Sequence, residues 1–194
     1  IFDGDSLIQT THYPNTFDAI SGYNDLISLN ENKLILAGSF SPTYPSYNPH
    51  PFIVATDNTG QILWDTVYTQ YQRSRLWDIS QANENGEFYA AAEVNWVNDV
   101  RDGLLLKIDS TGQIIWEQII DFIQNDYIFR CLATKDGGVL VYYSEVGFNA
   151  RLIKFDFQGN TEWMSSILFE DGFVSGMDIS NDNNYILSCT VNND

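Results

Sequence analysis

The stretch that decides the fold occurs three times: DNTGQILW at Asp57–Trp64, DSTGQIIW at Asp109–Trp116 and DFQGNTEW at Asp156–Trp163. Each copy follows a short apolar run and continues into a second one. The aspartate can cap a tight turn through its side chain, and the glycine can adopt a positive φ at little steric cost. Each copy therefore predicts a β-hairpin whose outgoing strand begins at the tryptophan. We expect the recurring residues to be structural: Asp57, Gly60, Trp64, Asp109, Gly112, Trp116, Asp156, Gly159 and Trp163.

A second set of polar turns lies upstream of these hairpins and keeps the same step of about 50 residues. The turns are Asn30–Lys33, Asn83–Gly86, Lys135–Gly138 and Asn181–Asn184. Short strand-like runs flank every turn, and no stretch has a helical period. Four antiparallel strands in each repeat are typical of a β-propeller blade. A two-layer sandwich could use such strands, but it would not require the same four-strand unit to recur.

We therefore expect an all-β fold, with residues 1–194 forming a single β-propeller region of four-stranded blades. Residues 1–16 would be the outgoing strand of a preceding blade, 17–70, 71–122 and 123–170 complete blades, and 171–194 the first half of another. The unfinished last unit favours an incomplete arc of a larger propeller of about six to eight blades. A closed four-bladed ring would lack one strand. The remaining blades would come from the same longer chain or from a partner.

The composition excludes several classes of function. A formal net charge of −17 and a pI near 4.1 argue against binding to a phosphate backbone. The apolar runs are short and broken, so we expect no transmembrane segment. The sequence opens without an initiator Met or a long apolar run, which predicts that a targeting peptide is absent or already removed. With its acidic character, this favours a secreted or cell-surface protein.

No local pattern points to catalysis. His12 and His50 are the only histidines, and neither lies near a cysteine or the other histidine. Cys131 and Cys189 lie far apart without metal-ligand spacing, and their positions in the repeat otherwise hold apolar or small residues. We expect no enzymatic activity, no cofactor and no metal. Buried free thiols are favoured, and a disulfide between neighbouring blades stays open as the alternative.

The departures from the repeat are the candidates for function. Two long inserts, Ser41–Pro51 and Glu93–Gly103, replace the short connection of the third unit, and binding residues concentrate in such loops. Equivalent loops of successive blades emerge on one face. We therefore expect a neighbouring aromatic and polar patch that suits a protein or glycan partner. Its residues would be Tyr44, Tyr47, His50, Trp96 and Arg101. The plainer interpretation is tolerated surface loops.

The apolar strand ending in Asp, the Gly turn and the Trp, placed after a DGG-like hairpin, resemble the blades of the quinoprotein-alcohol-dehydrogenase-like propeller superfamily. They are most similar to secreted repeat proteins of the kind exported through type IX secretion, over nearly the whole chain. That superfamily includes enzymes and scaffolds, so the resemblance implies a fold rather than a reaction. The chain lacks an adjacent cysteine pair, and its motif has one residue fewer between Asp and Gly than the enzymes' tryptophan-docking repeat.

Three functions stay open at this point. We favour a non-catalytic scaffold or binding module of an exported or cell-surface protein that presents its loops for protein or glycan binding. A quinoprotein-like enzyme would instead carry pyrroloquinoline quinone and calcium at the propeller axis, as the resemblance implies. A structural spacer within a large adhesin would have a sequence indistinguishable from that of the first.

Overall fold

The structure, a computed structural model, describes residues 2–3, 6–7, 20–41, 48–97, 100–121, 126–145, 150–167 and 172–191. Every regular element among these residues is a β-strand, so the expected all-β class is confirmed. In this part of the chain, no helix exists that is long and apolar enough to cross a membrane.

From β3 onward, three four-stranded antiparallel sheets and a two-stranded sheet follow one another along the chain, which we number first to fourth. The first sheet contains β3 (Ile20–Asn30), β4 (Lys33–Ser41), β5 (His50–Asp57) and β6 (Ile62–Val67). The second contains β7 (Arg75–Gln81), β8 (Phe88–Val97), β9 (Val100–Ile108) and β10 (Ile114–Ile120). The third contains β11 (Asp126–Ala133), β12 (Val139–Glu145), β13 (Ala150–Phe155) and β14 (Thr161–Ile167). The fourth contains β15 (Gly172–Ile179) and β16 (Tyr185–Val191).

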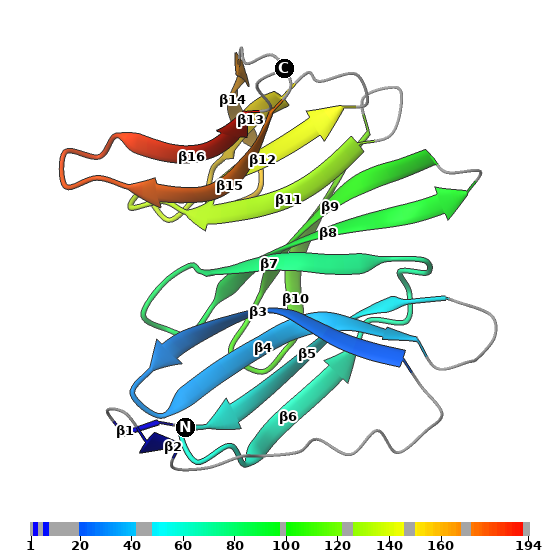
Figure 1. The fold of residues 1–194 in the computed structure, drawn as a ribbon, viewed down its shortest axis with the longest axis vertical. Coiled ribbons are helices and arrows are strands. Elements are labelled where there is room, and N and C mark those ends of the chain that lie inside the picture. Colours follow the sequence, from blue (N-terminus) through cyan, green and yellow to red (C-terminus); the bar gives the residue numbers. More distant parts are fainter. Residues whose placement is uncertain are drawn as a thin grey trace.

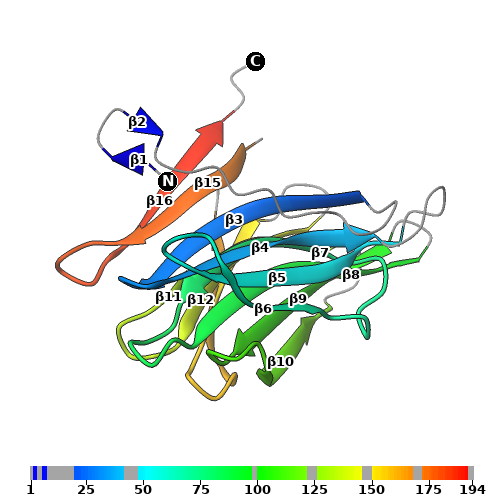
Figure 2. The same ribbon diagram turned by 90° about the horizontal axis from the view of Figure 1, so that it is seen from below.

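Within each sheet the strands are hydrogen-bonded in sequence order, as the repeat predicts. The sheets pack face to face in a stack, with the first and the fourth sheet at opposite ends (Figure 1). Figure 2 shows the same stack from below, with the first sheet nearest the viewer. The first strand of each sheet lies against the preceding sheet: β7 contacts β3, β4 and β5, and β11 contacts β7, β8 and β9.

The apolar core is divided into layers between successive sheets. Leu76, Phe88 and Leu104 of the second sheet belong to the layer shared with the first sheet. Tyr89 and Leu105, one residue further along, belong to the layer shared with the third sheet. Because side chains alternate between the two faces of a strand, a sheet covered on both sides needs a continuous apolar run. This explains the unbroken runs FYAAA and GLLL in the second unit.

Three details differ from the sequence-based expectations. The insert Glu93–Gly103 is not a loop over most of its length, because β8 and β9 extend through it and pair as far as Val97 with Val100. Its valines favour extended strands, and pairing satisfies the backbone polar groups. At the other end of the chain, β2 (Ser6–Leu7) pairs with β1 (Phe2–Asp3) rather than joining another sheet. A strand so near in sequence costs the least entropy to reach.

The two cysteines also differ from each other. Both are free, and Cys131 is buried between the second and third sheets as expected. Cys189 is exposed, so the prediction that it is buried was wrong. It lies on β16, the last described strand, where no further strand of the sheet covers it within the described residues.

The three Asp–Gly turns have the geometry that their spacing predicts. Asp57 Oδ1 accepts hydrogen bonds from the backbone N–H of Thr59 (2.8 Å) and of Gln61 (2.9 Å), and also from the Thr59 hydroxyl (2.7 Å). The Thr59 hydroxyl and then the Gln61 N–H hold the pKa of this carboxyl below its usual value. The glycines of the three turns, Gly60, Gly112 and Gly159, have φ angles of 85°, 87° and 88°.

The tryptophans join each sheet to the turn of the next one. Trp64 Nε1 donates a hydrogen bond to the carbonyl oxygen of Ser110 (3.0 Å), in the turn that contains Gly112. A Cβ atom on Gly112 would lie 2.9 Å from Cζ3 of the Trp64 ring. Trp116 Nε1 likewise donates to the carbonyl oxygen of Phe157 (3.1 Å). The glycine therefore serves twice, because it adopts a positive φ and lets the indole approach the backbone.

Gly112→Ala should destabilise the protein more than Gly137→Ala. Both glycines have a positive φ, near 87° and 84°, which costs an alanine about 1–2 kcal/mol. A Cβ on Gly137 would meet only an ordinary contact at 3.7 Å, whereas one on Gly112 would collide with Trp64. We expect overpacking to add about 1–3 kcal/mol at Gly112, measured by urea unfolding. Equal losses for the two variants would contradict the docking role of the glycine.

Candidate binding face

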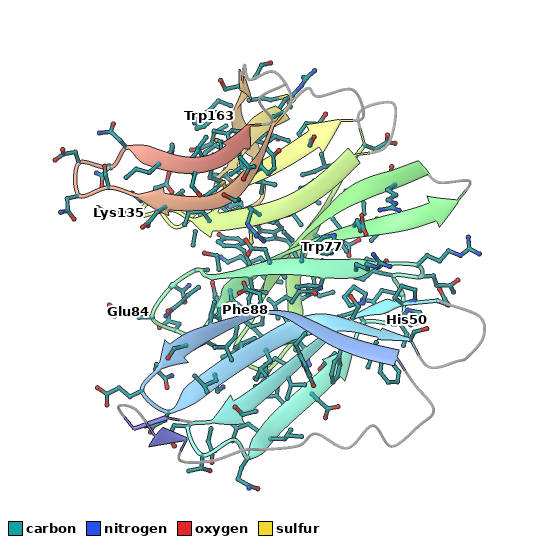
Figure 3. All side chains as sticks on the ribbon, in the orientation of Figure 1. His50, Trp77, Glu84, Phe88, Lys135 and Trp163 are labelled. Atoms are coloured by element: carbon teal, nitrogen blue, oxygen red, sulfur yellow. The ribbon has the colours of Figure 1, made fainter. Side chains whose placement is uncertain are left out.

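The antiparallel strand order places the connections on two opposite edges of the stack. The tight polar turns, with Glu84 and Lys135, gather on one edge, which we call the turn edge. The connections from second to third strand and from one sheet to the next gather on the other, the loop edge, where His50 lies. Figure 3 shows Glu84 and Lys135 on the left and His50 on the right. The described ends of both long inserts lie at the loop edge.

His50 begins β5 and is only 6% exposed. Its Nδ1 atom lies 2.8 Å from the carbonyl oxygen of Tyr71, and a carbonyl can only accept, so Nδ1 carries the proton. The Tyr71 hydroxyl in turn hydrogen-bonds to the Glu117 carboxylate on β10. Burial, followed by this carboxylate, raises the pKa of Tyr71. His50 is therefore buried beneath the connection between the first and second sheets and hydrogen-bonds to it, rather than presenting its ring to solvent.

The connection that contains Tyr71 is held by backbone hydrogen bonds to the residues just before β5. Ser74 N–H donates to the carbonyl oxygen of Pro49 (2.8 Å). Arg73, which has a φ of 48°, donates its N–H to Oδ1 of Asn48 (3.0 Å). These bonds link the segment before β5 to the segment before β7 and fix their relative positions at the loop edge.

A buried ion pair supports the second sheet at the same edge. The Glu93 side chain is 0% exposed, and its Oε2 lies 3.1 Å from the guanidinium Nη1 of Arg101, which is 27% exposed. Burial raises the pKa of Glu93, and the guanidinium of Arg101 opposes that shift. Arg75, which pairs with Glu93 across the strands, lies with its guanidinium 5.9 Å from the ring centre of Trp77. Arg101 is thereby held at one position on the edge.

The two kinds of cation are separated between the edges. Four of the five arginines lie in or beside the strand ends at the loop edge: Arg73, Arg75, Arg101 and Arg151. All four lysines lie at the turn edge: Lys33, Lys107, Lys135 and Lys154. The planar guanidinium group binds carboxylates in a bidentate manner and stacks on flat rings, which a lysine ammonium does not. The loop edge is therefore the better equipped of the two for recognising a ligand.

Part of the predicted patch can be placed. His50 and Arg101 both lie at the loop edge, on the first and second sheets respectively. Tyr44 and Tyr47 lie outside the described residues, and so does the side chain of Trp96 on β8. Sequence reasoning missed Glu93 as the support of Arg101. A charged residue within the apolar run FYAAAEV is the signal that could have revealed a buried pair.

A second polar cluster lies on the first strands of the sheets. Asp78 Oδ2 accepts the backbone N–H of Cys131 (2.7 Å), and Asp25 Oδ2 accepts that of Ile79 (2.9 Å), so each carboxylate bonds to the next sheet. Arg130 Nη1 lies 3.6 Å from Asp78 Oδ1. Burial and the charge of Asp25 raise the pKa of Asp78 to about 7. A pocket of about 250 Å³ borders this cluster, and among the described residues no group of three metal-ligating side chains exists.

Comparison with known proteins supports the fold and leaves the function open. No family model matches the chain, and no curated protein does. A solved structure of a protein of unknown function from Bacteroides caccae is similar, with a TM-score of 0.58 and 11% sequence identity. The similarity covers 87% of this chain and 53% of that one, so the chain spans about half the length of this neighbour.

Asp78→Asn should change how the stability depends on pH. With its pKa raised in the folded state, Asp78 binds more protons folded than unfolded between about pH 4 and 7. Its contribution to the free energy of unfolding therefore falls as the pH rises through this window. Asparagine keeps an acceptor for the Cys131 N–H but does not titrate. We expect the variant to gain stability relative to the original chain from pH 4 to 7, measured by urea unfolding. Parallel stability curves would contradict this assignment.

Proposed function

We propose that the chain is an arc of a β-propeller and acts as a non-catalytic binding module of an exported or cell-surface protein. Face-to-face packing of successive four-stranded sheets supports the propeller, because each sheet would be one blade. The similarity to a longer structure, of which it covers 53%, supports the arc. Kinship with the quinoprotein-like propellers remains part of the same proposal.

The observation that carries the binding role is the gathering of arginines on the edge that also bears both long inserts. These inserts hold Tyr44, Tyr47 and Trp96, whose rings suit stacking on a sugar or a peptide. The ion pair beneath Arg101 limits its freedom before a ligand arrives, which lowers the entropic cost of binding. A protein or glycan partner fits this combination of flat rings and guanidinium groups.

The described polar groups favour binding over acid–base chemistry. His50 supports a connection through the Tyr71 carbonyl, and Glu93 holds Arg101. Both side chains are buried and serve the scaffold, which leaves them poorly placed to exchange protons with a ligand. The role we propose is therefore recognition by a rigid frame rather than turnover.

The double variant Tyr47→Ala with Trp96→Ala should lose binding to a glycan array or to intact cell surfaces. Removing two aromatic contacts at the centre of an interface typically weakens binding at least tenfold. Phe157→Ala is the matched control, because this aromatic side chain is 56% exposed at the turn edge. It should bind as the original chain does. Circular dichroism should show that both variants keep their sheets. Unchanged binding by the double variant, or an equal loss in the control, would overturn the proposal.

A further inference from the structure

The third tryptophan of the repeat differs from the other two. Trp64 and Trp116 are half-buried, and each donates its Nε1 proton to a carbonyl oxygen of the next sheet. Trp163 is 38% exposed, and its ring centre lies 6.1 Å from that of Tyr185 on β16. Nowhere in the described chain does its Nε1 find a hydrogen-bond acceptor. Figure 3 shows Trp163 near the end of the stack formed by the third and fourth sheets.

The difference follows from what the fourth sheet contains. The acceptor for Trp64 lies in the turn between β9 and β10, and the acceptor for Trp116 in the turn between β13 and β14. Each of these turns joins the third and fourth strands of the following sheet. In the fourth sheet the structure describes β15 and β16 alone. Among the described residues, no hairpin therefore takes the corresponding place beside Trp163.

The other donors at these contacts show the same pattern. Lys33 Nζ shares the Ser110 carbonyl oxygen with Trp64, at 3.1 Å, and Lys107 Nζ shares that of Phe157 with Trp116, at 3.5 Å. Lys154 corresponds to Lys107 in the repeat, and both pair with acidic side chains of their own sheets. Among the described residues, however, Lys154 bonds to no carbonyl oxygen of another sheet. The Nε1 of Trp163 is thus the donor that can still bond to a carbonyl oxygen of a further hairpin.

The strand edge next to Trp163 is also unpaired among the residues that the structure describes. β16 corresponds to β12 and β8, each of which pairs with a third strand on its outer side. Ile186, the second residue of β16, is 53% exposed. An uncovered strand edge with an apolar residue on it is a ready template for another strand.

We propose that the outer edge of β16 and the Trp163 indole form a docking site for one β-hairpin with an Asp-x-x-Gly turn, supplied by polypeptide outside residues 1–194. The first strand of the hairpin pairs antiparallel with β16. Its glycine lies under the Trp163 ring, and the residue after its aspartate offers the carbonyl oxygen to Nε1. Continuity with the two described contacts identifies this occupant. This inference rests on the proposed propeller arc; because the site is separate from the loop edge, its failure would leave the proposed binding role intact.

The test uses the ¹⁵N-labelled chain and an unlabelled peptide of residues 150–167, which copies the β13–β14 hairpin. The indole resonance of Trp163 is assigned by its loss in Trp163→Phe. We expect this resonance to shift on addition of the peptide, while those of Trp64 and Trp116 stay in place. The matched control is the same peptide with Gly159→Val, which should cause no shift, because valine avoids a positive φ and blocks the indole.

Three results would overturn the proposal. The first is a Trp163 resonance that the peptide leaves unchanged, and the second is an equal response to both peptides. The third is a shift of Trp163 that grows with protein concentration in the absence of peptide, because a second copy of the chain would then occupy the site. Circular dichroism of Trp163→Phe should match that of the original chain, which keeps the assignment valid.

Discussion

The stack of sheets depends on the contact between a tryptophan of one sheet and a glycine turn of the next. The indole covers the turn backbone, and its Nε1 donates a hydrogen bond to a carbonyl oxygen of that turn, which also accepts one from a lysine Nζ. The aspartate side chain in turn fixes the loop by accepting hydrogen bonds from backbone N–H groups of the turn. Since each turn belongs to the sheet that follows, a single short motif both closes a hairpin and sets the place of its neighbour.

This constraint explains how two edges with different tasks arise. The turns that contact a tryptophan must remain short and regular. The turn edge also carries lysines that bond to these turns, such as Lys33, whose Nζ donates to the Ser110 carbonyl oxygen. The opposite edge has no such requirement, and there the connections vary in length and arginines such as Arg101 gather. Variation in the loops can therefore alter binding without disturbing the contacts between sheets.

The elements that the sequence predicts best are those set by neighbouring residues. Asp57, Gly60 and Gln61 are close in the chain, and turn chemistry alone predicts their hydrogen bonds. The pairs Glu93–Arg101 and Asp78–Cys131 depend on strand register and on packing between sheets, which spacing in the sequence does not encode. Cys189 is exposed because the strands that cover its equivalents in the earlier sheets are not among the described residues of the fourth sheet. The predicted patch includes Tyr44 and Tyr47, which lie outside the described residues.

The most direct test of this account is a double-mutant cycle between Trp116 and Gly159, followed by urea unfolding. A Cβ on Gly159 would lie 3.1 Å from Cδ2 of the Trp116 ring. Gly159→Ala should therefore cost more in the original chain than in the Trp116→Ala background, where the indole is gone and only the positive φ is unfavourable. The account predicts a coupling free energy of about 1 kcal/mol or more between the two sites. Additive losses would contradict the claim that this contact joins the sheets.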